Sequence, residues 1–474
     1  MTTRTTSKEK HIAADEALRY LHHLNSLTSA DASGLAKALQ FRDSGSSRSK
    51  RARGRQSDLS SDEDNDDPGR IRSSYAKKES LFSNAEDFWA AIGWAFNCSV
   101  AHKNRWDRWR LWLEFMFNVL EDDLDARHRQ AAQEMPNKKD KIFSKSLLAT
   151  YLAPFIDQGR NPKRRIMRAI LADGTQPSIN QFPSVYVNET RPPKSKADSK
   201  IGTKRSLDLD QGEFGDYFDS DSDDNNDTTP AGRTSTRHSS TNASRQDSPD
   251  SSTTTPQPPT PTSQTSPFAT HGGSSSLHLR LRLLSLLSHF SSLAPALFLD
   301  PEDLFDLYTE FLRPLPLPVF SFLLLPNTTT TTTTTTTGLD PNSLASLTQM
   351  LLRPLLSSSA PISNANSLTP ASFATHFAPF SANVANATEN ARVGVCVEVL
   401  LRLLWTEGAL EFAGAEVREK VREAVEEGIR AREERVGSTG GGDGRRKSGG
   451  KIVVEGVQVL RACGERLRGL LGMV

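Results

Sequence analysis

The sequence predicts an all-α protein, built as an irregular helical array or solenoid-like bundle in two portions and interrupted by long disordered segments. Apolar residues recur at helical spacing in most segments. No segment alternates apolar and polar residues between hairpin turns, as a β-strand would. The hydrophobic fraction is 36 %, below the roughly 45–50 % of globular domains. We attribute the difference to polar segments that separate ordinary folded ones.

Residues 1–42 are predicted to hold the N-terminal helices. The first runs from about residue 8 to 25, with an apolar set at helical spacing: Ile12, Ala14, Leu18, Leu21 and Leu24. A shorter helix follows at about 32–41. Residues 43–80 form a basic and then acidic loop with almost no apolar side chains. Such a segment cannot repay the entropy of ordering, so we expect it to be disordered.

Residues 81–172 are predicted to form a Trp-rich helical core. Five of the six tryptophans lie between residues 89 and 112. Placed on helices, this stretch forms an αα-hairpin with its turn near residues 102–104. Trp106 and Trp109 fall on an apolar face that covers more than half of the second helix, which is typical of a buried helix. A narrow polar stripe is expected to face solvent: Asp107, Arg110, Glu114, Asn118 and Glu121.

The tryptophan cluster has two alternative interpretations besides a structural core. In the first, Trp94 and Trp112, which lie off the main faces, dock a protein partner. In the second, the indoles stack on bases while arginines bind phosphate. The arginines between the tryptophans point to different sides of the helix, which disfavours a nucleic-acid groove. The acids at positions 121–123 are predicted to be a solvated helix end.

Four segments complete the predicted organisation. Residues 173–275 are rich in Ser, Thr, Pro and Asp and are expected to be a disordered regulatory linker. Residues 276–436 form a C-terminal helical portion with low-complexity loops, including ten consecutive threonines at 328–337. Residues 437–450 are a Gly-rich linker, and residues 451–474 form the last helix.

A dense basic run lies in the first predicted loop. The sequence RSKRARGR is typical of a nuclear localisation signal, and the alternative is a solvated basic tail. The candidate residues of the signal are Arg48, Lys50, Arg51, Arg53 and Arg55. An acidic block follows at once and favours the signal interpretation.

The polar segments also hold candidate modification and docking residues. Ser60 and Ser61 each precede an acid by three residues, which suits acid-directed kinases. Ser-Pro and Thr-Pro pairs suit proline-directed kinases, although chance produces such pairs in this composition: Ser248, Thr255, Thr260 and Ser266. The acidic island EFGDYFDSDSDD is either an inert stretch or a motif that docks a partner through its aromatic residues: Phe214, Tyr217 and Phe218.

The sequence offers no pattern for catalysis, a cofactor or a metal. The stretch GGGDGRRKS has Arg446 before Lys447, where a phosphate loop needs glycine. The three cysteines lie far apart and lack zinc-site spacing: Cys98, Cys396 and Cys463. No signal peptide, membrane span or small-molecule site is evident, and the net charge of +1 gives no global attraction to nucleic acid.

These observations predict a non-enzymatic nuclear scaffold or adaptor subunit of a multiprotein assembly, with chromatin as one setting. Protein partners would bind helical grooves and disordered motifs. One alternative is a direct DNA- or RNA-binding protein that uses the basic loops. The other is a cytosolic trafficking or signalling adaptor with an incidental basic run.

Overall fold

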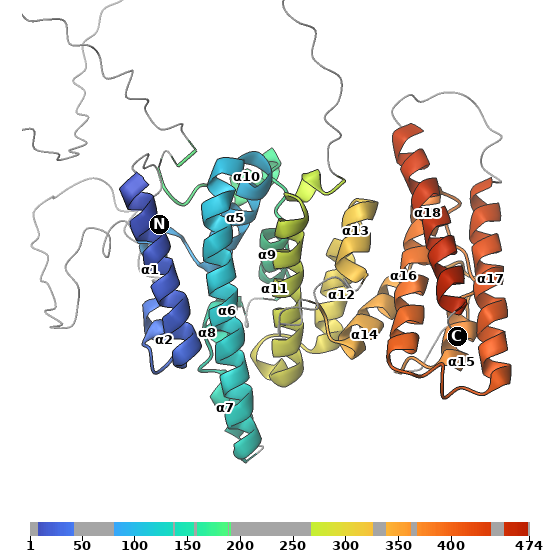
Figure 1. Cartoon of the computed structure of the whole chain (residues 1–474), viewed down its shortest axis with the longest axis horizontal. Coiled ribbons are helices and arrows are strands. Elements are labelled where there is room, and N and C mark those ends of the chain that lie inside the picture. The colour runs from blue at the N-terminus through green and yellow to red at the C-terminus, as the bar shows by residue number, and fades with distance from the viewer. Residues whose placement is uncertain are drawn as a thin grey trace, which may run out of the picture. The chain divides into compact units, whose positions relative to one another are not determined.

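A computed structural model describes the protein at residues 8–41, 80–135, 138–155, 159–187, 189–190, 267–325, 338–361, 367–437 and 450–472 (Figure 1). Residues 1–192 and 265–474 belong to one compact unit, and the second unit, 193–264, lies outside the described residues. Among the described residues the one β contact is an isolated bridge between Leu356 and Ala382. The all-α prediction is confirmed.

The first helical portion covers residues up to 190. Its helices are α1 (Lys8–Leu27), α2 (Leu35–Ala38), α4 (Leu81–Asn84), α5 (Phe88–Ala101), α6 (Lys103–Gln133), α7 (Lys139–Phe143), α8 (Leu147–Leu152), η2 (Ala153–Phe155), α9 (Arg160–Ile170) and α10 (Gln176–Gln181). His102 alone separates α5 from α6, so the predicted hairpin turn is confirmed.

The second portion begins after residue 266. Its helices are η4 (Ala269–His271), α11 (Ser274–Leu293), η5 (Pro295–Leu297), α12 (Pro301–Leu312), α13 (Leu317–Leu324), α14 (Pro341–Leu352), α15 (Pro370–His376), α16 (Ala387–Thr406), α17 (Ala415–Gly437) and α18 (Gly450–Leu471). The side chain of Asn386 accepts a hydrogen bond from Glu389 N and so caps the N-terminus of α16. Helix α16 packs against α13, α14 and α18.

The two portions pack against each other along α11. In Figure 1 α11 stands beside α6, and the Arg282 guanidinium of α11 binds the Glu121 carboxylate and the Asn118 amide oxygen of α6. Deeper in the core, Arg280 donates to Ile170 O at 2.6 Å and Ala172 O at 2.8 Å. These carbonyls lie at the C-terminal end of α9, where helix carbonyls lack intrahelical donors. A buried cation therefore joins the portions.

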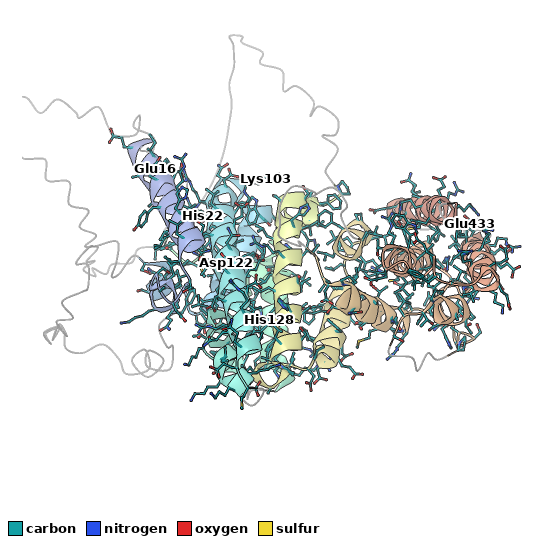
Figure 2. The ribbon with its side chains drawn as sticks, turned by 60° about the horizontal axis from the view of Figure 1, so that its bottom comes forward. Glu16, His22, Lys103, Asp122, His128 and Glu433 are labelled. Atoms are coloured by element: carbon teal, nitrogen blue, oxygen red, sulfur yellow. The ribbon has the colours of Figure 1, made fainter. Side chains whose placement is uncertain are left out.

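Helix α6 contacts several neighbours through three consecutive acids. Glu121 pairs with Arg282 of α11, and Asp122 accepts a hydrogen bond from Asn25 of α1. Figure 2 shows Asp122 on the stretch of α6 beside α1. Successive helical residues point about 100° apart, which explains the different partners. The prediction of a solvated helix end is wrong here, because α6 continues to Gln133.

Asp123 is the third of these acids. It is buried, accepts a hydrogen bond from Leu147 N at 2.9 Å and lies 3.4 Å from Arg127 Nε. Burial raises its pKa, while the hydrogen bond from Leu147 and the Arg127 charge act in the opposite direction. The carboxylate thereby ties the start of α8 to the middle of α6.

The predicted boundaries of the 173–275 linker are wrong at both ends. Helix α10 lies within the first residues assigned to the linker, and Phe182, which follows α10 in the sequence, is completely buried. Helix η4 and the first turn of α11 lie inside its end. Polar composition suggested disorder there, but Phe182, Glu189 and His271 are each inserted into the helical unit. A few anchoring side chains can order a segment whose average composition is polar.

Candidate protein-binding surfaces

Most of the candidate residues in the polar segments lie outside the described residues. The basic run of the localisation signal, the six phosphorylation candidates and the aromatic residues of the acidic island all fall in the stretches 42–79 and 191–266. Their roles stay predictions. The two remaining docking candidates, Trp94 and Trp112, lie in α5 and α6.

The tryptophan hairpin is part of the core. The Trp89 indole is fully buried and donates to Tyr151 O at 3.0 Å. Phe88 stacks on the Tyr151 ring with centroids 4.3 Å apart. Trp109 and Trp112 meet edge to face at 5.5 Å, a geometry that aromatic pairs favour. The cluster fixes α5, α6 and α8 together.

Trp94 and Trp112 are both buried, at 1 % and 7 % exposure. This burial contradicts the exposed position that a docking role required of them. For Trp94 the physical reason is that α5 is enclosed by α6, α9 and α10, so even the side of α5 opposite its main apolar face meets protein. Trp112 of α6 is covered by the rings of Phe88 and Trp109. The hairpin does not present an aromatic platform in this structure.

A buried carboxylate sits near the turn of the hairpin. Glu189 accepts a hydrogen bond from Trp94 Nε1 on Oε2 at 2.9 Å and from Trp109 Nε1 on Oε1 at 2.7 Å. Arg105 Nε and Nη2 lie 3.4 and 3.3 Å from Oε1. The Glu189 side chain is fully buried, so both oxygens exchange water for protein donors.

Glu189 was missed by the sequence reasoning because it lies in the segment predicted to be disordered. The one local signal is the apolar pair Val185 and Tyr186, which packs against the core. A charged residue in a polar stretch gives no sign of its own burial. Its partners are 80 or more residues away in sequence, so only the fold brings them together.

All three cysteines are buried and none forms a disulfide. Burial, followed by the negative charge of Glu189, raises the pKa of Cys98 above its ordinary value. Burial also raises the pKa of Cys463 to about 12. Because the thiolate is the nucleophile and the metal ligand, neither thiol is poised for chemistry near neutral pH. Among the described residues no group of three His, Cys, Asp or Glu side chains is placed to hold a metal ion.

The outer face of α1 carries the most regular set of exposed apolar side chains. Ile12, Tyr20 and Leu27 are 52 %, 67 % and 82 % exposed. Together with Glu16 and His23, these three side chains lie within an arc of about 80° around the axis of α1. The opposite side of α1 faces α6, where Arg108 binds Asp15 and His11. Ile12 was predicted to be on the apolar side with Leu18, but the helix turns it outward.

Two further surfaces stand out. At the turn between α16 and α17, Phe412 is 90 % exposed and Trp405 is partly exposed. At the junction of α6 and α7, Met135 is exposed near a group of exposed lysines: Lys138, Lys139, Lys141 and Lys145. One of these, Lys138, pairs with Glu134 at 3.0 Å.

The comparisons with known proteins give no relative. No protein-family model, no curated protein and no solved structure matches this chain. Of the described helices, none is both long and apolar enough to cross a membrane.

Proposed function

We propose that the protein is a non-enzymatic nuclear scaffold that binds protein partners, and that the outer face of α1 is one docking surface. The observation that supports the proposal is the helical spacing of Ile12, Tyr20 and Leu27 on the side of α1 away from α6. The end of a helical array normally carries a polar outer face. An apolar face there favours contact with another protein.

The partner is an amphipathic helix that lies along α1. Such a helix would place apolar residues at i, i+4 and i+7 spacing against this face. The charges on the face define the rest of its chemistry. Glu16, which pairs with Arg19 at 2.7 Å on the same helix, favours a basic residue opposite it on the partner.

Binding of a purified partner tests the α1 surface. Proteins crosslinked through a photoreactive residue at position 20 supply the partner, and its affinity for the full chain is then measured. The variant I12S/Y20S/L27S is expected to weaken binding by about a hundredfold, because apolar anchors carry most of an interface energy. The matched control is A13S/A17S on the same helix. Equal affinities for the triple variant and wild type would disprove the surface.

A charge test on the same complex is more specific. Glu16→Lys is expected to weaken binding by about tenfold, because the face then carries a cation opposite a base. Reversal of the opposing base on the partner should restore the affinity. If the double reversal remains as weak as the single one, the helix orientation proposed here is wrong.

The nuclear part of the proposal is supported by the basic run at residues 48–55, which lies outside the described residues. A fluorescent fusion of the full chain is expected to accumulate in the nucleus, and deletion of residues 48–55 should release it to the cytosol. A cytosolic signal for both fusions would support the alternative of a trafficking or signalling adaptor.

The alternative of direct nucleic-acid binding has one structural observation in its favour, the lysine group between Lys138 and Lys145. Binding through these lysines would fall steeply with salt, because phosphate contacts release counterions. The variant K139E/K141E should then abolish it. For the scaffold, we expect no salt-sensitive binding of DNA or RNA by the full chain, and no difference between the variant and wild type.

A further inference from the structure

The Glu189 site has the composition of a receptor for a carboxylate. All of its donors come from the α5–α6 hairpin, namely Trp94, Trp109 and Arg105. The carboxylate comes from an irregular segment far along the chain. The Arg105 side chain is 18 % exposed, so the site borders solvent on that side.

The segment that carries Glu189 has a fully buried side chain near each end. At one end the Phe182 ring lies over Gly93, so closely that a Cβ on residue 93 would be 2.3 Å from the ring. At the other end is Glu189 itself. Between them the side chains at 183–187 are exposed or half-buried, and Val187 is 87 % exposed. Release of the segment after Phe182 thus means the loss of the buried Glu189 contacts and of the partial core packing of Val185 and Tyr186.

We infer that Trp94, Trp109 and Arg105 form a carboxylate-binding site, that Glu189 is its internal ligand, and that a glutamate in an acidic peptide segment can take its place. The indole N–H groups and the guanidinium are donors only, so the ligand must present acceptors on both oxygens. A carboxylate satisfies this requirement, whereas an amide would set its NH2 group against an N–H donor. The positive charge of Arg105 further favours an anion.

Exchange would couple the site to the chain that follows it. When another carboxylate enters, residues 183–190 leave the hairpin. An internal ligand acts at a high effective concentration, in the millimolar range for a short tether. An external peptide therefore competes only when it brings additional contacts or is locally concentrated, which makes the site selective for a specific acidic segment.

Chemical rescue in the full chain tests the carboxylate site. Glu189→Ala leaves space beside three unpaired donors, so sodium propionate should raise its Tm with saturation, while propionamide and sodium chloride at equal ionic strength should not. Wild type and the double variant E189A/R105A are the controls. Overlap of the propionate and chloride curves for Glu189→Ala would overturn the assignment.

A peptide of residues 183–192 tests the exchange. We expect the fluorescently labelled peptide to bind the Glu189→Ala protein at least about tenfold more tightly than wild type, whereas a peptide that carries the substitution Glu189→Gln should bind neither protein.

Hydrogen exchange in the wild-type protein tests the same exchange even if the variant does not fold. A millimolar excess of the unsubstituted peptide should speed hydrogen exchange at residues 183–190 and leave α10 unchanged. Unchanged exchange there would overturn the inference. Because this site is separate from α1, a negative result here would not contradict the proposed scaffold function.

Discussion

Arg280 shows how single residues carry charge into this core. Burial lowers its pKa to about 9, so the guanidinium is still charged at neutral pH. Two carbonyls of the α9 end and the Phe96 ring, 4.3 Å away, replace water around it. Arg432 repeats the arrangement with Ala378 O and Phe380 O, each at 3.1 Å. Arg280 supplies donors that the end of α9 lacks, and Arg432 supplies donors to carbonyls of the irregular chain after α15.

His271 makes stability depend on pH. Burial, followed by the Arg280 charge, lowers its pKa from 6.5 to about 4. In the unfolded chain the imidazole protonates as pH falls below 6.5, while in the folded chain it stays neutral. Neutral His271 therefore contributes to the free energy of unfolding above pH 6.5. This contribution is lost as the pH falls toward 4, and the total loss is about 3 kcal/mol.

His271→Asn removes this proton linkage. Urea unfolding of wild type and variant between pH 7 and 4 should give a difference in unfolding free energy that shrinks as pH falls. Groups that titrate in both proteins cancel in the difference. A difference that is constant with pH would show that His271 is not the titrating group.

Trp106 tests the structural role of the tryptophan cluster. Trp106→Ala should lower the free energy of unfolding by about 3–5 kcal/mol, because it leaves a cavity in a packed core. The matched control is Tyr20→Ala on the exposed face of α1, for which we expect a change within about 0.5 kcal/mol. Chemical denaturation measures both. A small effect at Trp106 would return the cluster to the docking interpretation.

At the scale of the element, helices come close where a glycine permits it. A Cβ at Gly428 of α17 would lie 1.8 Å from the carbonyl oxygen of Ala378, which follows α15 in the sequence. Gly469 of α18 is equally helical, but a Cβ there would have nothing within 4 Å. The two positions thus separate the packing effect of glycine from its effect on helix propensity.

Gly428→Ala is expected to lower the free energy of unfolding by about 1–3 kcal/mol, because α17 must move away from α15. Gly469→Ala is expected to raise it by up to about 1 kcal/mol, because alanine forms helix better than glycine. Thermal unfolding followed by circular dichroism distinguishes the two. Effects of the same sign would contradict the close contact between α17 and α15.

At the scale of the whole molecule, contacts across the predicted linker join the two helical portions. Arg280 reaches α9 from α11 inside the core, and Arg160 of α9 reaches Asp306 of α12 on the surface at 2.7 Å. Arg160 and Asp306 are both more than half exposed, and exposed pairs contribute little. The buried contact should therefore dominate the coupling of the portions.

Arg280→Met should cost about 1–3 kcal/mol for each of the two carbonyls that lose a donor. Arg160→Met breaks a contact between the same two portions and should cost less than about 1 kcal/mol. Limited proteolysis beside α9 and α11, together with denaturation, measures the difference. Equal costs would mean that the interface does not depend on the buried cation.

The sequence by itself determined the all-α class and the long helices, because apolar spacing, Asp and Asn caps and proline positions act within a few residues. It also placed the hairpin turn near residues 102–104 and predicted the burial of Trp106 and Trp109. The predictions from sequence were wrong where a residue far away in the sequence decides whether a side chain is buried. The sequence alone put Asn118 and Glu121 in solvent, yet Arg282 covers them. It put Trp94 off the core, yet α9 and α10 enclose α5.

Only the tertiary structure decided the fate of charged residues. Arg280, Arg432 and Glu189 look like ordinary surface residues in the sequence, and each is buried against groups 50 or more positions away. Burial of a charge depends on several donors or acceptors converging in space, and no local pattern encodes that convergence. The candidate carboxylate site on the α5–α6 hairpin, and its own ligand Glu189, were therefore found only once the chain was folded.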